Sequence, residues 1–578
     1  MEAIGHVRLY WVVALLAATL TTILVTWLLL EMLPSSQRRE ICSAVVVEVV
    51  NISSGRVPLY GLLEVDLNVT ASYDNPFDPD QVNVTAVFEL PSGRKMTVPA
   101  FYYQEYERRL VDGREFLRPV GDPYWKIRFT PIEVGAHRFY VEVRDRCGNV
   151  ARSKTLRFEV IPSHKRGFIR VCPYSRYLCF DNGSSTFFVG HNVCWYGPRG
   201  TFDYDEWFSE MAASGENLAR IWMAPWAFGI EWEELGRYDL AEAWRLDYVL
   251  KLAEEEGIYV ILCLMNHGQL QSGGLTGEWG DNPYNRVNGG PLARPEEFWT
   301  DANALELFER RLRYIVARWG YSTHILAWEL WNEADLTDGY NPEVVVEWHR
   351  IVARYLRELD PYKHLVTTSF ANPSRKPGVW SLDEVDIVTV HRYGPQSFAD
   401  IAGSIAQLVR EGWSEYGKPV IVEEFASDWR WFNKPLYYED REGIEIHNGA
   451  WSAIMAGSPA TGMLWWWDNY VHPYKLYSHY AALAAFLRGV DPHSSALEEL
   501  KGEPVLPGDL EEYLGSLTIY PSLGWARPIA SVFEVTLSGE VGNKSQLSYF
   551  IQGRAHPELR SNPAFRATSP MAVESWSA

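Results

Sequence analysis

From Phe187 to about residue 490, short apolar segments alternate with longer amphipathic segments, and this alternation constrains the fold most strongly. The apolar segments have the length of buried strands, whereas the amphipathic ones place apolar residues at helical spacing. Strands separated by helices predict a parallel sheet, because each return to the same edge needs a long crossover. Eight such units predict an α/β fold, a (β/α)₈ barrel over residues 167–492. The expected strands lie near 187–197, 218–224, 259–267, 325–333, 365–370, 386–394, 419–425 and 462–468, and the clearest helices lie at 242–257, 305–320 and 342–360.

Two β-rich regions flank this barrel. Residues 41–162 alternate apolar and polar side chains between turn residues, which predicts an Ig-like β-sandwich. Residues 493–578 contain three or four short apolar segments, too few for a stable sandwich, so we expect a C-terminal β-domain that is incomplete.

Two of the expected barrel strands end in carboxylates. Glu333 closes the segment WELWNE at 328–333, and Glu423 and Glu424 lie in VIVEEF at 420–425. Burying a carboxylate costs free energy, so a pair at strand ends, where barrel active sites lie, is best explained by catalysis. One acid/base carboxyl and one nucleophilic carboxylate indicate a glycosidase.

Six segments together resemble the barrel strands of the clan A glycoside hydrolases, family 5 in particular, over roughly residues 167–490. The resemblance implies that Glu333 is the general acid/base and that Glu424, immediately before Phe425, is the nucleophile of a retaining enzyme. The six segments are FFVGHNVCWYG from Phe187, GENLARIW from Gly215, WNE ending at Glu333, VDIVTVHRYG from Val385, KPVIVEEF ending at Phe425 and GMLWWWDN from Gly462.

By the same resemblance, the sandwich over residues 41–162 is an Ig-like module that either binds polysaccharide or packs against the barrel as a spacer.

The same resemblance implies roles for the surrounding side chains. Arg220 and Tyr393 would hydrogen-bond the nucleophile and keep it ionised. Asn332 would hold the 2-hydroxyl of the sugar. His391 would orient the neighbouring polar groups, and Trp465 would be the stacking platform under the reacting sugar.

Several aromatic and polar positions leave two readings open. Trp467 shares the strand face of Trp465 and would extend its platform, whereas Trp466 should point into the layer between barrel and helices. Trp222 and Trp195 either line outer subsites or pack against neighbours. At the end of the third strand, the binding residue is either His267 or Asn266.

The strand pattern also makes predictions about the carboxylates. Glu423 and Glu424 should point to opposite sides of their strand, so that one faces the cleft. Glu329, four residues before Glu333 on the same strand face, should lie about 13 Å deeper as a buried carboxylate paired with an arginine. Burial among Trp328 and Trp331 should raise the pKa of Glu333, as an acid catalyst requires.

Composition narrows the ligand. The aromatic share of 14%, with 25 tryptophans, suits the flat C–H faces of sugars. A net charge of −21 argues against nucleic acid or another anionic polymer, so the expected partner is a neutral polysaccharide. The chain has no CxxC or HExxH pattern, so neither a metal nor another cofactor is expected.

The cysteines and the long Gly/Asn-rich run from Gly268 to Pro295 carry structural expectations. Cys172 and Cys179 flank a turn, and Cys42 and Cys147 could tie the ends of one domain together as disulfides. The Gly268–Pro295 run is too long for a simple connection and should wall the cleft. The two remaining cysteines, expected as buried thiols, are Cys194 and Cys263.

Residues 1–34 read as a membrane anchor or a signal segment. No charged residue occurs from Leu9 to Leu30, a length that just spans a bilayer as a helix. An uncleaved anchor is favoured over a signal peptide because no small-x-small cleavage site follows. Sequons suggest an external body, membrane-anchored or secreted; they begin at Asn51, Asn68, Asn83, Asn182 and Asn543.

The leading expectation is therefore a retaining, endo-acting β-glycanase that hydrolyses β-1,4-glucan such as cellulose. A β-mannanase of the same fold is the alternative, because a few loop contacts separate an equatorial from an axial 2-hydroxyl. An inactive surface protein that binds carbohydrate is the alternative of a different class.

Overall fold

The computed structural model describes residues 42, 44–375, 377–393, 401–426, 429 and 440–493, and the backbone of two strands at 515–519 and 531–535. The expected membrane segment Leu9–Leu30 and the sequon at Asn543 lie outside the described residues. Within these ranges, no helix is both long and apolar enough to cross a bilayer.

The N-terminal residues form the predicted β-sandwich. One sheet has the order β1(Val46–Ile52), β3(Leu63–Thr70), β7(Arg114–Phe129), β6(Phe101–Val111). The other has the order β2(Arg56–Pro58), β10(Leu156–Ile161), β8(Gly135–Asp145), β4(Val82–Glu89), β5(Lys95–Pro99), with β9(Val150–Arg152) paired to β8. Alternate side chains of each strand fill the space between the sheets, where Phe88 stacks on Phe129 at 3.8 Å between ring centroids.

The barrel predicted from the alternation is also present. Five parallel strands pair in chain order: β13(Gly190–Asn192), β14(Leu218–Trp222), β15(Tyr259–Cys263), β16(Ile325–Glu329) and β17(Leu365–Thr367). After Thr368 the fifth strand continues as β18(Ser369–Phe370), which pairs with β19(Val388–Arg392), and β19 pairs with β20(Val420–Phe425). Residues 459–465 complete the ring, because Met463 N–H donates to Val422 O (2.9 Å) and Asn192 N–H donates to Leu464 O (3.1 Å).

Helices pack around this ring as the periodicity predicted. They are α2(Thr201–Ala213), α3(Leu240–Glu256), α4(Ala302–Trp319), α5(Pro342–Leu359), α7(Ile401–Tyr416), α9(Ile444–Met455) and α10(Ser478–Phe486). Asp239 and Asp301 cap α3 and α4 by accepting from first-turn N–H groups, which fixes where those helices begin. Over the described part of the connection between β18 and β19, two 3₁₀ turns, η6(Pro373–Arg375) and η7(Gly378–Ser381), replace a helix.

A short hairpin closes the N-terminal end of the barrel. It consists of β11(Ile169–Val171) and β12(Leu178–Phe180), joined by a disulfide between Cys172 and Cys179. Its apolar residues pack with Leu218, Ile261 and Leu326 from the bottom of the strands. The hairpin covers the N-terminal end of the barrel, so we expect the active site at the C-terminal end.

The four remaining cysteines form one further disulfide and two buried thiols. Cys42 and Cys147 form a second disulfide, which ties the start of the sandwich to the turn after β8. Cys194 and Cys263 are free and buried, and burial raises the pKa of both thiols.

Of the C-terminal region, β21(Gly515–Ile519) and β22(Ser531–Val535) pair as antiparallel strands.

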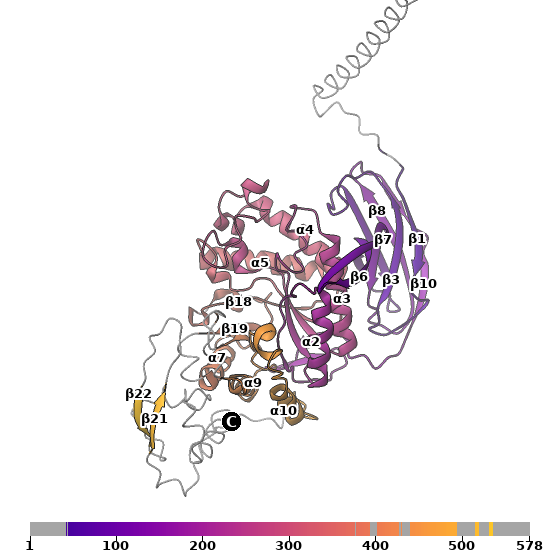
Figure 1. Cartoon of the computed structure of the whole chain (residues 1–578). Helices are drawn as coiled ribbons and strands as arrows, with labels where there is room; N and C mark the ends of the chain where they lie inside the picture. The colour runs from indigo at the N-terminus through magenta and orange to yellow at the C-terminus, as the bar shows by residue number, and fades with distance from the viewer. Residues whose placement is uncertain are drawn as a thin grey trace, which may run out of the picture.

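The sandwich lies against the α3 and α4 side of the barrel (Figure 1). At this contact Arg128 of β7 donates to Asp247 of α3 (2.6 Å), and Arg318 of α4 donates to the same carboxylate (2.6 Å). All three side chains are buried. Because a buried charge is costly without its partner, this triad fixes the sandwich against the barrel.

Candidate active site

Glu333 and Glu424 converge at the C-terminal end of the barrel, from the ends of the fourth and seventh strands. They are 8% and 3% exposed. Three atoms lie within 4.8 Å of one another: a carboxylate oxygen of Glu333, a carboxylate oxygen of Glu424 and a ring nitrogen of His391. This spacing suits direct attack on a sugar by one carboxylate while the other protonates the leaving group, because an inverting pair is separated by about 6.5–9.5 Å.

The backbone at Glu333 is not the extended strand that the sequence suggested. Strand β16 ends at Glu329, and Glu333 has φ 53° and ψ 53° in the left-handed region. The turn brings Glu333 beside Ser369, whose Oγ accepts from Glu333 N–H (3.2 Å) and donates to Glu329 (2.8 Å). Asn332 still pairs with Asn266 in the register of Glu329 with Cys263, so the left-handed conformation begins only at Glu333. The expected depth of about 13 Å for Glu329 stays a prediction. Strained backbone of this kind is frequent at active sites.

Arg220, the third residue of β14, hydrogen-bonds two of the buried carboxylates. Its guanidinium donates to both oxygens of Glu329 (2.7 and 2.8 Å), to Glu424 Oε1 (2.5 Å) and to Asn332 Oδ1 (2.8 Å). Arginine suits this role because its planar fork can hold several oxygens at fixed angles. Glu329 is thus paired with an arginine, and that arginine also touches Glu424.

A β-bulge changes the expected geometry of Glu423. In the pairing of β19 with β20, Val390 faces Val422 but His391 faces Glu424, so Glu423 is the extra residue. The bulge turns both carboxylates inward: Glu423 lies 3.4 Å from Arg220 Nε and is fully buried. Simple alternation, which placed them on opposite sides, does not hold here.

Glu424 makes further contacts with Tyr393 and His391, and the other ring nitrogen of His391 lies 3.7 Å from Glu423 Oε2. Tyr393 OH donates to Glu424 Oε2 (2.7 Å), and His391 Nδ1 lies 3.5 Å from the same oxygen. The imidazole of His391 also hydrogen-bonds Glu333 Oε1 (2.9 Å), so one ring nitrogen serves both carboxyls.

These contacts shift the pKa values of the whole group. Burial lowers the pKa of His391, but Glu424 and Glu333 outweigh burial and raise it to about 10. Burial raises the pKa of Glu333, yet the hydrogen bond and charge of His391 outweigh it, and the pKa lies below its usual value. The pKa that we expected to be raised is therefore lowered in the free protein. Burial raises the pKa of Glu424 despite His391 and Arg220, and raises that of Glu329 to about 7 despite Arg220.

His267 and Asn266 both lie near the site, in different ways. His267 Nδ1 is 3.4 Å from Glu333 Oε2 and 3.1 Å from Asn332 Nδ2, and its ring is partly exposed. Asn266 is buried, and its Oδ1 accepts from Gly268 N–H (2.9 Å) to start the next turn. His267 is thus the member of this pair that contacts the Glu333 carboxyl.

Five tryptophans form an aromatic wall beside the carboxylates, and they are Trp195, Trp222, Trp226, Trp465 and Trp467. Trp195 lies at the centre, 5.5 Å from Trp465, 5.2 Å from Trp226 and 4.8 Å from Trp467 between ring centroids. Trp195, Trp226 and Trp465 reach the surface, and Trp226 is 47% exposed.

Two of the five do not offer a sugar platform in this structure. Trp467 is 1% exposed because it lies in the π-helical turn η8(Trp467–Val471) behind Trp195, which corrects its expected role as an extension of the platform. Trp222 is buried against Trp465 (5.2 Å), so it packs instead of lining a subsite. Trp466 is buried as well.

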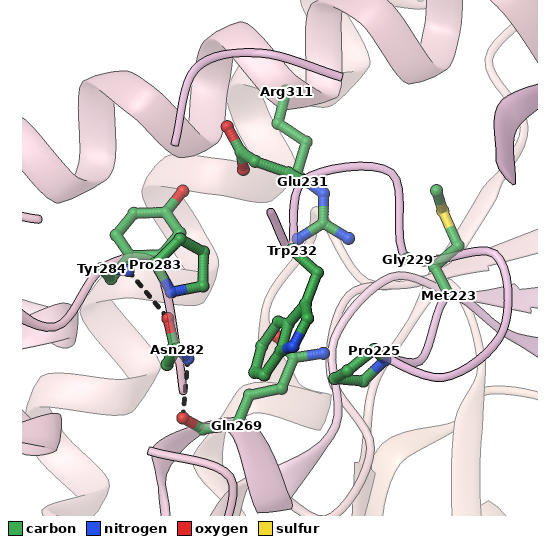
Figure 2. A pocket seen from close by; sticks show the side chains of 10 residues that line it. All are labelled: Met223, Pro225, Gly229, Glu231, Trp232, Gln269, Asn282, Pro283, Tyr284 and Arg311. Atoms are coloured by element: carbon green, nitrogen blue, oxygen red, sulfur yellow. Dashed lines mark hydrogen bonds between the residues drawn. The ribbon is translucent and has the colours of Figure 1, made fainter. Parts of the chain in front are cut away.

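The Gly268–Pro295 run borders a pocket beside the cleft (Figure 2). The pocket has about 260 Å³ of empty space, partly open to solvent, between this run, the loop after β14 and helix α4. Glu231 and Arg311 meet at one end, and the Tyr284 hydroxyl points toward Glu231. Burial raises the pKa of Glu231 to about 7, although Arg311 and a hydrogen bond from Tyr284 oppose this.

The sequence alone did not single out Ser369 or Trp226. Ser369 begins the short strand β18 without any motif, and its contact with Glu333 depends on the left-handed turn there. Trp226 lies in a loop after β14, and a tryptophan between Pro225 and Gly229 was the available signal.

Known proteins agree with this geometry. Residues 179–470 match the family model "Cellulase (glycosyl hydrolase family 5)", and residues 56–144 match "Domain of unknown function (DUF5060)". A mannan endo-1,4-beta-mannosidase A of Podospora anserina is 30% identical over 202 residues, 32% of this chain and 50% of the relative. The enzyme of the same name from Emericella nidulans is 27% identical over 273 residues, 42% of this chain and 67% of the relative. The chain spans about half the length of several curated relatives that it matches.

Among solved structures, a protein from Bacteroides vulgatus described as a glycoside hydrolase superposes with a TM-score of 0.52 at 16% identity. The superposition covers 82% of this chain and 88% of that chain. At such low identity the likeness supports the fold alone.

Proposed function

The chain belongs to glycosyl hydrolase family 5, and from this premise we propose that it is a retaining, endo-acting β-mannanase. It is a glycoside hydrolase built on a (β/α)₈ barrel. The single observation that supports a retaining mechanism best is the approach of Glu333 and Glu424 to within 4.8 Å. The names of the curated relatives favour mannan over the β-glucan that the sequence analysis put first.

In the first step Glu424 attacks the anomeric carbon and Glu333 protonates the leaving oxygen. Arg220 and Tyr393 each hydrogen-bond one oxygen of Glu424 and hold the carboxylate in position for attack. As Glu424 bonds to the sugar its negative charge is lost, and His391 can then shift its hydrogen bonding fully to Glu333. In the second step Glu333, now ionised, takes a proton from a water molecule whose oxygen bonds to the anomeric carbon. The bond to Glu424 breaks, Glu424 leaves as a carboxylate, and the sugar is released with its original configuration.

Asn332 would hold the 2-hydroxyl of the reacting sugar. Its Oδ1 accepts from Arg220 and its Nδ2 faces His267, so both the amide and its surroundings are fixed. Trp465 would stack under the same sugar, and Trp195 and Trp226 would contact neighbouring units. A surface that extends beyond one sugar supports endo action on a polymer.

We also propose that the protein works outside the cell. Disulfides persist in oxidising compartments, and the structure contains two. The four described sequon asparagines are exposed and so available for glycans; they are Asn51, Asn68, Asn83 and Asn182.

Two measurements test the proposal. Reducing-sugar release should be larger from unsubstituted β-1,4-mannan than from carboxymethylcellulose, with Glu424→Gln as the inactive control. NMR of the first product should show the β-anomer. Faster release from the cellulose derivative would assign the enzyme to glucan, and an initial α-anomer would exclude the retaining mechanism. No release from either polymer would favour the carbohydrate-binding alternative.

A further inference from the structure

The hairpin β6–β7 of the N-terminal sandwich reaches the turn that precedes barrel helix α2. Glu115, near the start of β7, donates its N–H to Pro198 O (3.1 Å). Its Oε1 accepts from the N–H of Thr201 (3.0 Å) and from the Thr201 hydroxyl. A Cβ on Gly200 would overlap the Glu115 carboxylate, so the two segments pack at van der Waals contact.

Glu115 therefore caps a helix of another domain. The N-cap residue of α2 is Gly200, which has no side chain to bond the free N–H groups of the first turn. A carboxylate at this position also interacts favourably with the positive end of the helix dipole. The Glu115 side chain is 2% exposed, which keeps this interaction shielded from water.

The carboxylate of Glu115 is also the first member of a network that runs through α3. Arg245 Nε donates to Glu115 Oε2 (2.6 Å), and Arg245 Nη1 donates to Glu242 Oε1 (2.6 Å). The other oxygen of Glu242 accepts from Tyr196 OH (2.6 Å) and from the N–H of Phe228 (2.8 Å).

Tyr196 and Phe228 belong to the two loops that present the aromatic wall. Tyr196 follows Trp195 in the loop between β13 and α2, and Phe228 lies two residues after Trp226 in the loop between β14 and α3. Phe228 has a left-handed φ of 61°, so its N–H is held in a strained turn by Glu242. The rings of Tyr196 and Phe228 also meet edge-on at 5.0 Å.

We propose that the N-terminal domain is a positioning element of the active site, in which Glu115 acts through Arg245 and Glu242 to hold Trp195 and Trp226 against the substrate. The sugars concerned are the units beyond the one that reacts, because Trp465 lies under that one. This inference rests on the proposed glycanase function. It assigns a task to the region that matches a domain of unknown function.

The kinetic test compares Glu115→Ala and Glu115→Gln with Glu107→Ala. Glu107 is a matched control because it lies on the same hairpin but pairs with Arg109 and Arg118 at the surface. For mannohexaose, Glu115→Ala should raise KM about threefold to tenfold, the cost of leaving one or two side chains to be ordered on binding. Its kcat, its pH profile and its KM for a short aryl β-mannoside should match the wild type. Glu115→Gln retains an oxygen for Thr201 and should show a smaller effect.

A second readout needs no activity. Hydrogen exchange at residues 195–201 and 226–229 should be faster in Glu115→Ala than in Glu107→Ala, while β16 and β20 remain protected. Equal exchange in the two variants, or a loss of kcat with no dependence on substrate length, would overturn the inference. If the wild type hydrolyses no glycan the proposed function fails, whereas the exchange rates still decide whether Glu115 holds the loops.

Discussion

Replacing Tyr393 by Phe tests how the protein keeps Glu424 ionised. The phenol donates one hydrogen bond to Glu424 Oε2 (2.7 Å), and this bond lowers the pKa of a carboxyl that burial raises. A hydrogen bond to a charged group contributes roughly 1.5–3 kcal/mol, and one pKa unit corresponds to about 1.36 kcal/mol. Removing it should therefore raise the pKa of Glu424 by about 1–2 units.

The sign of the effect follows from the role of each carboxyl. Attack requires ionised Glu424, so kcat falls as the pH drops through the pKa of Glu424 in the complex with substrate. A higher pKa moves this acid limb to higher pH by about 1–2 units, whereas the alkaline limb, set by loss of the Glu333 proton, stays in place. The measurement is the pH dependence of kcat on an aryl β-mannoside, with Tyr248→Phe as a control because Tyr248 bonds Asp205 outside the barrel mouth. An unmoved acid limb would refute the reasoning.

Three further outcomes are expected. His391→Gln should shift both limbs of the pH profile to higher pH, because the positive charge of His391 lowers the pKa of Glu333 and also that of Glu424. A shift of one limb alone would contradict the contact of His391 with both carboxyls. With a good leaving group, azide should restore turnover of Glu333→Ala and yield the β-glycosyl azide, whereas Glu424→Ala should yield the α-product; product NMR decides between them. Asp247→Asn should lower the free energy of unfolding by about 3–5 kcal/mol in urea, because Arg128 and Arg318 lose their buried counter-charge; a change below about 1 kcal/mol would show that solvent compensates.

The lowered pKa of Glu333 bears on how the free enzyme is protonated. Glu333 must hold a proton and Glu424 must lack one, yet the contacts lower the first pKa and raise the second. Glu333, Glu424 and His391 titrate together, so the proton is distributed among the three residues. The state with a protonated Glu333 and an ionised Glu424 is one of several protonation states of this group. We expect substrate, which displaces water from the cleft, to shift the proton toward Glu333.

Strand alternation and the two carboxylate-ending strands predicted the barrel and the convergence of Glu333 with a carboxylate of the seventh strand, whereas the resemblance to family 5 selected Glu424 over Glu423. The physical reason is topological: consecutive βα units wind in one direction, so all strand ends of one kind lie at one face. Residues at strand ends, such as Arg220 and His391, could therefore be placed together although they are far apart in sequence.

Tertiary structure alone decided the details that set the chemistry. The left-handed turn at Glu333, the bulge at Glu423 and the burial of Trp467 are departures from regular strand geometry, and no short sequence pattern marks them. The contact of Glu115 with Thr201 joins two domains, so it depends on how two separately patterned units pack. A sequence specifies regular elements through periodicity and local turn signals, whereas irregular backbone and contacts between domains arise from the balance of many distant interactions.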